Sequence, residues 1–194
     1  MCSVLRYDLN VMYRRIKKIP FHGNRTRCLV LRQQYAMFML HQLSEGKRVI
    51  NIDQSWLNET QFVRRCWRKR GEPNTMSQWA MNPRISVLMA IDTAGELYWA
   101  LTQVNTDTKI FCLFMQKLAN KLGQQDKRWR DNTIILIDGA KYQTNKESVS
   151  YMMALGFRVC ISAPYSYASS PIEYAFGYFK SVDLNPSKLK TGKK

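Results

Sequence analysis

The sequence of 194 residues is long enough for one domain with a short extension, and its 45% apolar residues suffice for a hydrophobic core. Thirty Lys and Arg residues against 14 Asp and Glu give a net charge of +16, far from the near-balance of an ordinary soluble enzyme. The composition therefore excludes a chain too polar to fold. Its distributed basic residues favour nucleic acid over a membrane or an acidic protein as the partner.

The five cysteines are odd in number and widely spaced, and they form no CxxC pair. This pattern argues against a disulfide framework or a zinc module. Cys112 and Cys160 lie in apolar stretches, which predicts small core residues. No apolar run approaches the length of a membrane span and the N-terminus lacks the apolar segment of a signal peptide, so we expect an intracellular, reducing compartment.

The spacing of apolar residues in the first quarter of the chain predicts two helices and a strand. Apolar residues among basic ones indicate a short helix that ends before Pro20, and near-helical spacing predicts a second helix over residues 26–43. The arginines of the second helix suit either a DNA-facing surface or a helix face that packs on the core. Residues 48–52 predict a short buried strand that ends by presenting Asp53.

The middle of the chain predicts a hairpin followed by a helix. Two apolar runs, residues 84–91 and 96–102, flank a four-residue connection that begins with Asp and ends with Gly. From Thr106 the apolar period changes to that of a helix, with Thr106 or Asp107 as N-cap and Gly123 as C-cap.

The last third alternates strands and helices. A β-branched strand over residues 133–137 ends at Asp138, and a helix over residues 145–155 leads to a strand over residues 157–161. A final helix, residues 171–182, begins with Pro and carries Glu173 in its first turn. The aromatic residues of this helix predict a face that packs on the core: Tyr174, Phe176, Tyr178 and Phe179.

Three acids, Asp53, Asp138 and Glu173, thus come from two strand ends and one helix. Divalent cations such as Mg²⁺ prefer oxygen ligands and keep several waters, so a few convergent carboxylates suffice to hold them. Two such ions activate the attacking oxygen and stabilise the leaving oxygen in phosphodiester cleavage. A lone Asp at a strand end is more often a cap or turn residue, and spacing by itself leaves both readings open.

A family resemblance connects the three acids. The stretches IDGAKYQ and SAPYSYASSPIEYAFGYFK resemble the second and third catalytic segments of Tc1/mariner-type DDE transposases, and 34 residues separate Asp138 from Glu173, as in members with a third Glu. RVINIDQSWLNET, with the tryptophan and the Lys-Arg-Gly group beyond it, resembles the first segment. The likeness spans residues 26–180, most of the chain.

The resemblance implies an RNase H-like α/β fold, a mixed five-stranded sheet flanked by helices. It also implies Mg²⁺, with Mn²⁺ as a substitute, bound by Asp53, Asp138 and Glu173, which are then both the metal ligands and the catalytic residues. The activity implied is metal-dependent cleavage of DNA strands at transposon ends and their transfer to target DNA, without a covalent protein intermediate.

The resemblance also implies double-stranded DNA partners, namely transposon ends and target, a homodimer on paired ends, and a nuclear location if the source is eukaryotic. A basic stretch beyond Asp53 is positioned to hold DNA phosphates, with a solvated basic loop as the other reading. This stretch contains Arg64, Arg65, Arg68, Lys69 and Arg70.

Some positions depart from the family pattern. Gln54 replaces the acid after the first Asp, Gly139 replaces an Asn, Gln143 replaces a His, and residues 167–170 replace the PDLN segment. These departures leave a second function class open, a non-catalytic, transposase-derived DNA-binding or assembly subunit. We divide the chain into a helical extension (1–45), remnant of a DNA-binding region or linker, a catalytic domain (46–185) and a basic tail (186–194) expected to be disordered.

Overall fold

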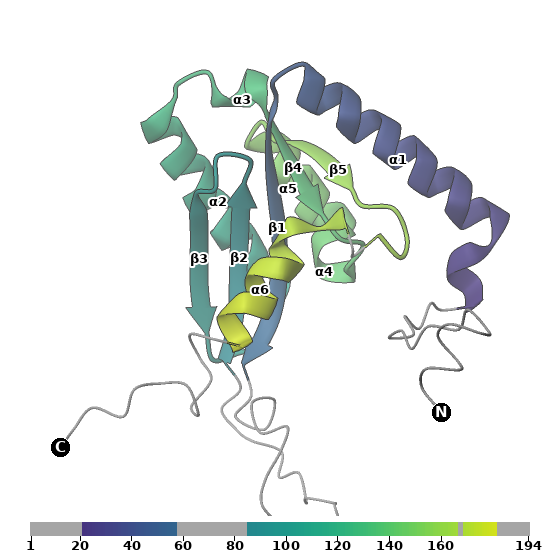
Figure 1. Ribbon diagram of the computed structural model, residues 1–194. Coiled ribbons are helices and arrows are strands. Elements are labelled where there is room, and N and C mark those ends of the chain that lie inside the picture. Colours follow the sequence, from purple (N-terminus) through teal and green to yellow (C-terminus); the bar gives the residue numbers. More distant parts are fainter. Residues whose placement is uncertain (1–20, 58–84, 167–168, 182–194) are drawn as a thin grey trace, which may run out of the picture.

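The computed structural model describes residues 21–57, 85–166 and 169–181, which form one mixed sheet with helices on both faces (Figure 1). The strand order is β3-β2-β1-β4-β5, which confirms the predicted mixed five-stranded sheet. β2 pairs antiparallel with β1 and β3, whereas β4 pairs parallel with β1 and β5. The strands are β1 (Arg48–Leu57), β2 (Ile85–Asp92), β3 (Leu97–Thr102), β4 (Thr133–Ile137) and β5 (Arg158–Ile161).

The helices lie in unequal groups around the sheet (Figure 1). They are η2 (Phe21–Asn24), α1 (Thr26–Ser44), α2 (Thr108–Gln125), α3 (Trp129–Asn132), α4 (Lys141–Thr144), α5 (Lys146–Ala154) and α6 (Pro171–Ser181). Helices α2 and α5 cover one face and form the main core with even-numbered residues of β1 and β2 and odd-numbered residues of β4. Helix α6 covers the other face, where Ile172 and Phe176 pack on Val87 and Met89.

The alternation of side chains along a strand decides which residues can meet at α6. Ile50 and Ile52 point into the main core, so Asn51 and Asp53 point to the α6 face. On β4, Ile135 and Ile137 point into the main core, so Leu136 points to the α6 face. The α6 face therefore receives Asn51 and Asp53 of β1.

Helix ends confirm several predicted caps. Asp107 accepts a hydrogen bond from the Ile110 amide at the start of α2, and Asn145 accepts one from the Ser148 amide at the start of α5. Gly156 follows α5 with φ +87°, a backbone conformation that glycine adopts at low cost.

Other boundaries correct the sequence predictions. Strand β1 continues through Asp53 to Leu57, because its antiparallel pairing with β2 extends beyond its parallel pairing with β4. Helix α2 passes Gly123 and has Asp126 as its C-cap, because Gly123 does not adopt the positive φ with which a glycine ends a helix. The short helices α3 and α4 were not predicted; they lie in the connections before β4 and before α5.

The aromatic face of α6 is narrower than predicted. Phe176 is buried, whereas Tyr174 and Tyr178 are 69% and 62% exposed, because only one stripe of the helix meets β1 and β2. Cys112 and Cys160 are half-buried thiols rather than full core residues. Helix α1 has no buried side chain, and its Leu40 is 67% exposed.

The predicted helix before Pro20 and the basic tail lie outside the described residues, and the division of the chain into three parts stays a prediction. None of the helices within the described ranges has the length and apolarity needed to cross a membrane.

Candidate active site

The register of two parallel strands brings the first two acids together. Ile52 of β1 is paired with Ile137 of β4, and this is the last pair of that ladder. Asp53 and Asp138 are the next residue of each strand, so they leave the ladder side by side. The carboxyl ends of neighbouring parallel strands thus deliver both carboxylates to one edge, as the family resemblance implied.

The third acid comes from the first turn of α6. The Glu173 amide donates a hydrogen bond to the Ser170 carbonyl at 3.2 Å, and the fully buried Ile172 holds this turn against β2. Asp53, Asp138 and Glu173 line one cavity of about 570 Å³, together with Gly139, Tyr165 and other residues of the β5–α6 connection. The structure therefore brings all three predicted site residues to one cavity.

The cavity concentrates negative charge. The pKa of Asp53 is raised to about 7, chiefly by burial and also by the neighbouring Asp138 and Glu173, whereas the Gln54 amide and Lys180 act to lower it. Bringing carboxylates together in a partly desolvated cavity is costly unless a proton or a cation compensates their charge.

The donor set fits hard divalent cations, since it consists of carboxylate oxygens. Within the described part of the chain, no three Asp, Glu, His or Cys side chains form a group able to hold a single ion.

Gln143, which stands where the resembling family has a histidine, orients Asp138. It is 1% exposed, and with its amide turned to suit its neighbours it donates to Asp138 Oδ1 at 2.7 Å and to the Asp138 carbonyl at 3.1 Å. The Ala140 amide also donates to Asp138 Oδ1, at 3.1 Å. These bonds leave Oδ2 to bind a ligand.

Gln54 has a different place. Its side chain donates to Ser86 Oγ at 2.8 Å, on the sheet face opposite to Asp53. The departure from the family's acid at this position therefore lies outside the cavity of the three acids.

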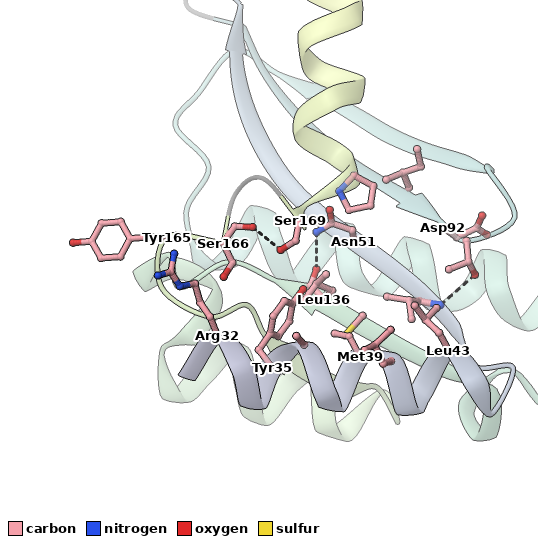
Figure 2. A pocket seen from close by; sticks show the side chains of 16 residues that line it. Arg32, Tyr35, Met39, Leu43, Asn51, Asp92, Leu136, Tyr165, Ser166 and Ser169 are labelled. Carbon is pink, nitrogen blue, oxygen red and sulfur yellow. Dashed lines mark hydrogen bonds between the residues drawn. The ribbon is translucent and has the colours of Figure 1, made fainter. Parts of the chain in front are cut away.

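Three residues near the cavity were missed by sequence reasoning. Tyr165 lines it with φ +61°, an unusual backbone conformation for tyrosine, and Figure 2 shows its ring directed away from the neighbouring side chains. Lys180 lies seven residues after Glu173 on α6, close enough for Asp53 and Glu173 to oppose the lowering of its pKa by burial. Helical spacing signals Lys180 in the sequence; nothing in the sequence signals the backbone of Tyr165. The third residue is Asn51.

The predicted DNA contacts Arg64, Arg65, Arg68, Lys69 and Arg70 lie outside the described residues. Their role stays a prediction.

The electrostatics of Asp53 predict a stability effect in metal-free protein. Its pKa is raised in the folded state, so its neutral form stabilises the fold below about pH 4, and this stabilisation is lost as the pH rises through about 7. Asp53→Asn should therefore raise the melting temperature at about pH 8, by at least about 3 °C for a chain of this size, and leave it unchanged near pH 4. Differential scanning fluorimetry in EDTA measures the melting temperatures of wild type and Asp53→Asn at both pH values. Equal melting temperatures of the two proteins at about pH 8 would contradict the raised pKa of Asp53.

The chain matches a known protein family and is similar to several solved structures. A family model described as DDE superfamily endonuclease matches residues 48–193. The crystal structure of the Mos1 mariner paired end complex with Mn is similar over 92% of this chain, with a TM-score of 0.66 and 16% identity. The crystal structure of the catalytic domain of Mos1 mariner transposase is similar over 86% of this chain and 76% of its own, with a TM-score of 0.55 and 16% identity.

A further similar structure is Mos1 transposase catalytic domain and Raltegravir with Mg, with a TM-score of 0.59 over 80% of this chain and 74% of its own, at 15% identity. The chain spans 60% of the length of the chain in the paired end complex with Mn. At these identities the likeness shows the fold, which is the RNase H-like fold of those catalytic domains. The comparison with curated proteins gave no match.

Proposed function

The chain belongs to the DDE superfamily endonucleases, and we propose that it is the catalytic domain of a Tc1/mariner-type transposase that cuts and joins DNA with divalent metal ions. One observation carries the proposal: Asp53, Asp138 and Glu173, far apart in sequence, line the same cavity. A non-catalytic assembly subunit would have no need of this convergence, and no observation favours that alternative.

The three acids serve as metal ligands. When bound, Mg²⁺ or Mn²⁺ lowers the pKa of an attacking hydroxyl and stabilises the charge on the leaving oxygen. Asp138 presents Oδ2 to the cavity while Gln143 and Ala140 hold Oδ1. Asp53 accepts the Gln54 amide through Oδ1 at 2.7 Å, which fixes its carboxylate in the same way.

Two displacements at phosphorus make up the proposed reaction. In the first, water attacks a phosphodiester at the transposon end, the bond to the 3′-oxygen breaks, and that oxygen leaves as a 3′-hydroxyl. In the second, this 3′-hydroxyl loses its proton and attacks a target phosphodiester; the bond from that phosphorus to the target 3′-oxygen breaks, and this oxygen takes up a proton and leaves as a 3′-hydroxyl. The protein contributes ligand geometry and a desolvated cavity, and no covalent intermediate forms on a side chain.

DNA is the proposed partner in both steps. The net charge of +16 attracts phosphates, and Arg64, Arg65, Arg68, Lys69 and Arg70 are the proposed contacts beyond Asp53. Related structures are described as paired-end complexes of Mos1 transposase. By analogy we propose a homodimer on two ends, and a nuclear location if the source is eukaryotic.

A strand-joining assay tests the proposal. A labelled duplex, cut to expose the terminal 3′-hydroxyl of the element that encodes this chain, is incubated with the protein, supercoiled plasmid and Mn²⁺. Joined plasmid is expected with Mn²⁺ or Mg²⁺, and none in EDTA or with a 3′-dideoxy donor, which lacks the nucleophile. Joining that persists with the dideoxy donor would contradict the proposed chemistry.

A further inference from the structure

A polar residue interrupts the buried part of β1. Asn51 is 5% exposed and stands between Ile50 and Ile52, both of which are fully buried. A buried amide is costly unless its donor and acceptor are both satisfied, so its partners indicate why it is present.

Asn51 bonds to two separate segments. Its Oδ1 accepts from Ser170 Oγ at 2.7 Å and from the Ile172 amide at 3.1 Å, and its Nδ2 donates to the Leu136 carbonyl at 3.3 Å. Figure 2 draws the bond to Leu136 and shows Asn51 near Ser169. The orientation of the amide is fixed, because the Ile172 amide can only donate and the Leu136 carbonyl can only accept.

These partners are the immediate neighbours of the three acids. Asn51 precedes Asp53 by two residues, Leu136 precedes Asp138 by two, and Ile172 directly precedes Glu173. One side chain on β1 thus ties β4 and the start of α6 to the strand that carries Asp53.

The bond to Ile172 also caps α6. The first amides of a helix have no partner within the helix, and Ile172 is fully buried, away from water. A side-chain oxygen at the N-cap position usually accepts such an amide. Here the hydroxyl of Ser170 instead bonds to Asn51, and the acceptor comes from β1.

We propose that Asn51 is a positioning residue that holds Asp53, Asp138 and Glu173 in the geometry needed to bind divalent ions. The inference rests on the proposed function, since it concerns the same acids. Outer-shell partners of metal ligands typically change metal affinity by about 10–100-fold when they are lost. A residue that served the stability of the fold alone would lower the melting temperature and leave metal affinity unchanged.

Asn51→Ala and a matched control separate these two roles. The control is Asn145→Ala, because Asn145 also caps a helix, with its oxygen accepting the amide of the fully buried Ser148, and does not line the cavity of the acids. Mn²⁺ binding is measured by electron paramagnetic resonance of free Mn²⁺, at a temperature where circular dichroism shows each variant folded. Asn51→Ala should weaken Mn²⁺ binding at least about tenfold, and Asn145→Ala should leave it near wild type.

Ser170→Ala gives a milder test should Asn51→Ala not fold. It removes one bond to Asn51 and leaves the Ile172 bond, so Mn²⁺ affinity should fall by a smaller factor of about 2–5. Wild-type Mn²⁺ affinity in a folded Asn51→Ala protein, or in Ser170→Ala if Asn51→Ala does not fold, overturns the inference and leaves the proposed function intact.

Hydrogen exchange of metal-free protein gives an independent readout. The Ile172 amide should be protected in wild type and exchange faster in Asn51→Ala, with the Ser148 amide unchanged; an Ile172 amide protected equally in both overturns the inference. Wild-type protein that binds no Mn²⁺ would instead refute the proposed function, and the exchange of Ile172 would still decide whether Asn51 holds α6.

Discussion

Asp138→Asn is expected to lower the rate of strand joining at least about a thousandfold, which corresponds to a loss of about 4 kcal/mol of transition-state stabilisation. The reason lies in the fixed orientation of this side chain. Oδ1 accepts from the Ala140 amide and from Gln143, and asparagine keeps an oxygen there. Its Nδ2 then occupies the place of Oδ2, where an amide nitrogen cannot bind Mg²⁺ or Mn²⁺.

The strand-joining assay with labelled donor and plasmid measures this loss. A gel-shift experiment with duplex DNA measures whether the variant still binds DNA. Duplex binding should stay within about twofold of wild type, since phosphate contacts depend on basic residues. Asp126→Asn is the matched control, because it makes the same chemical change at the exposed C-cap of α2 and should retain joining. If Asp138→Asn joined DNA as well as Asp126→Asn does, the enzymatic assignment would be wrong.

Asp92→Ala is expected to destabilise the fold by about 3 kcal/mol, the lower end of the cost of removing one partner of a buried ion pair. The Asp92 side chain is fully buried at the end of β2 and forms a salt bridge with Arg48. Its Oδ1 accepts from the Ala94 and Glu96 amides at 2.9 and 2.8 Å. The substitution would leave these two amides without an acceptor. Arg48 would lose its buried partner and keep its other hydrogen bonds, such as the one that it donates to the Tyr98 hydroxyl.

Urea unfolding followed by circular dichroism measures this cost. Glu96→Gln is the control, since its carboxylate is half exposed and its ion pair with Arg48 is longer, at 3.3 Å. Surface pairs of this kind contribute less than about 1 kcal/mol. A free energy of unfolding for Asp92→Ala equal to that of Glu96→Gln would show that the buried salt bridge does not stabilise the turn between β2 and β3.

The order of strands and helices was predictable because each element has a clear period. The β-branched run before Asp138 and the cap at Asn145 confirm the predicted strand and helix starts within a residue or two. Convergence of the acids was predictable only through the family resemblance. Spacing along the chain cannot show that Ile52 pairs with Ile137, which is what places Asp53 beside Asp138.

The features that sequence reasoning missed depend on contacts between distant segments. The far end of β1 was not predicted as strand, because its pairing with β2 depends on residues that follow much later in the sequence, as in the pair of Leu57 with Ile85. Asn51 was not singled out in the sequence, because its hydrogen bond to the Ile172 amide joins two distant segments. Gln143 appeared as a departure from a family pattern, whereas its amide takes the hydrogen-bonding role beside Asp138.

The bond from Ile172 to Asn51 joins residues 121 apart in sequence. Contacts of such separation require closure of a long loop and tend to form late in folding. A chain in which the sheet has formed but α6 has not docked holds Asp53 and Asp138 without Glu173. During synthesis, too, β1 and β4 leave the ribosome before α6. The cavity of the three acids is therefore complete only once α6 has docked on the sheet, because α6 carries Glu173.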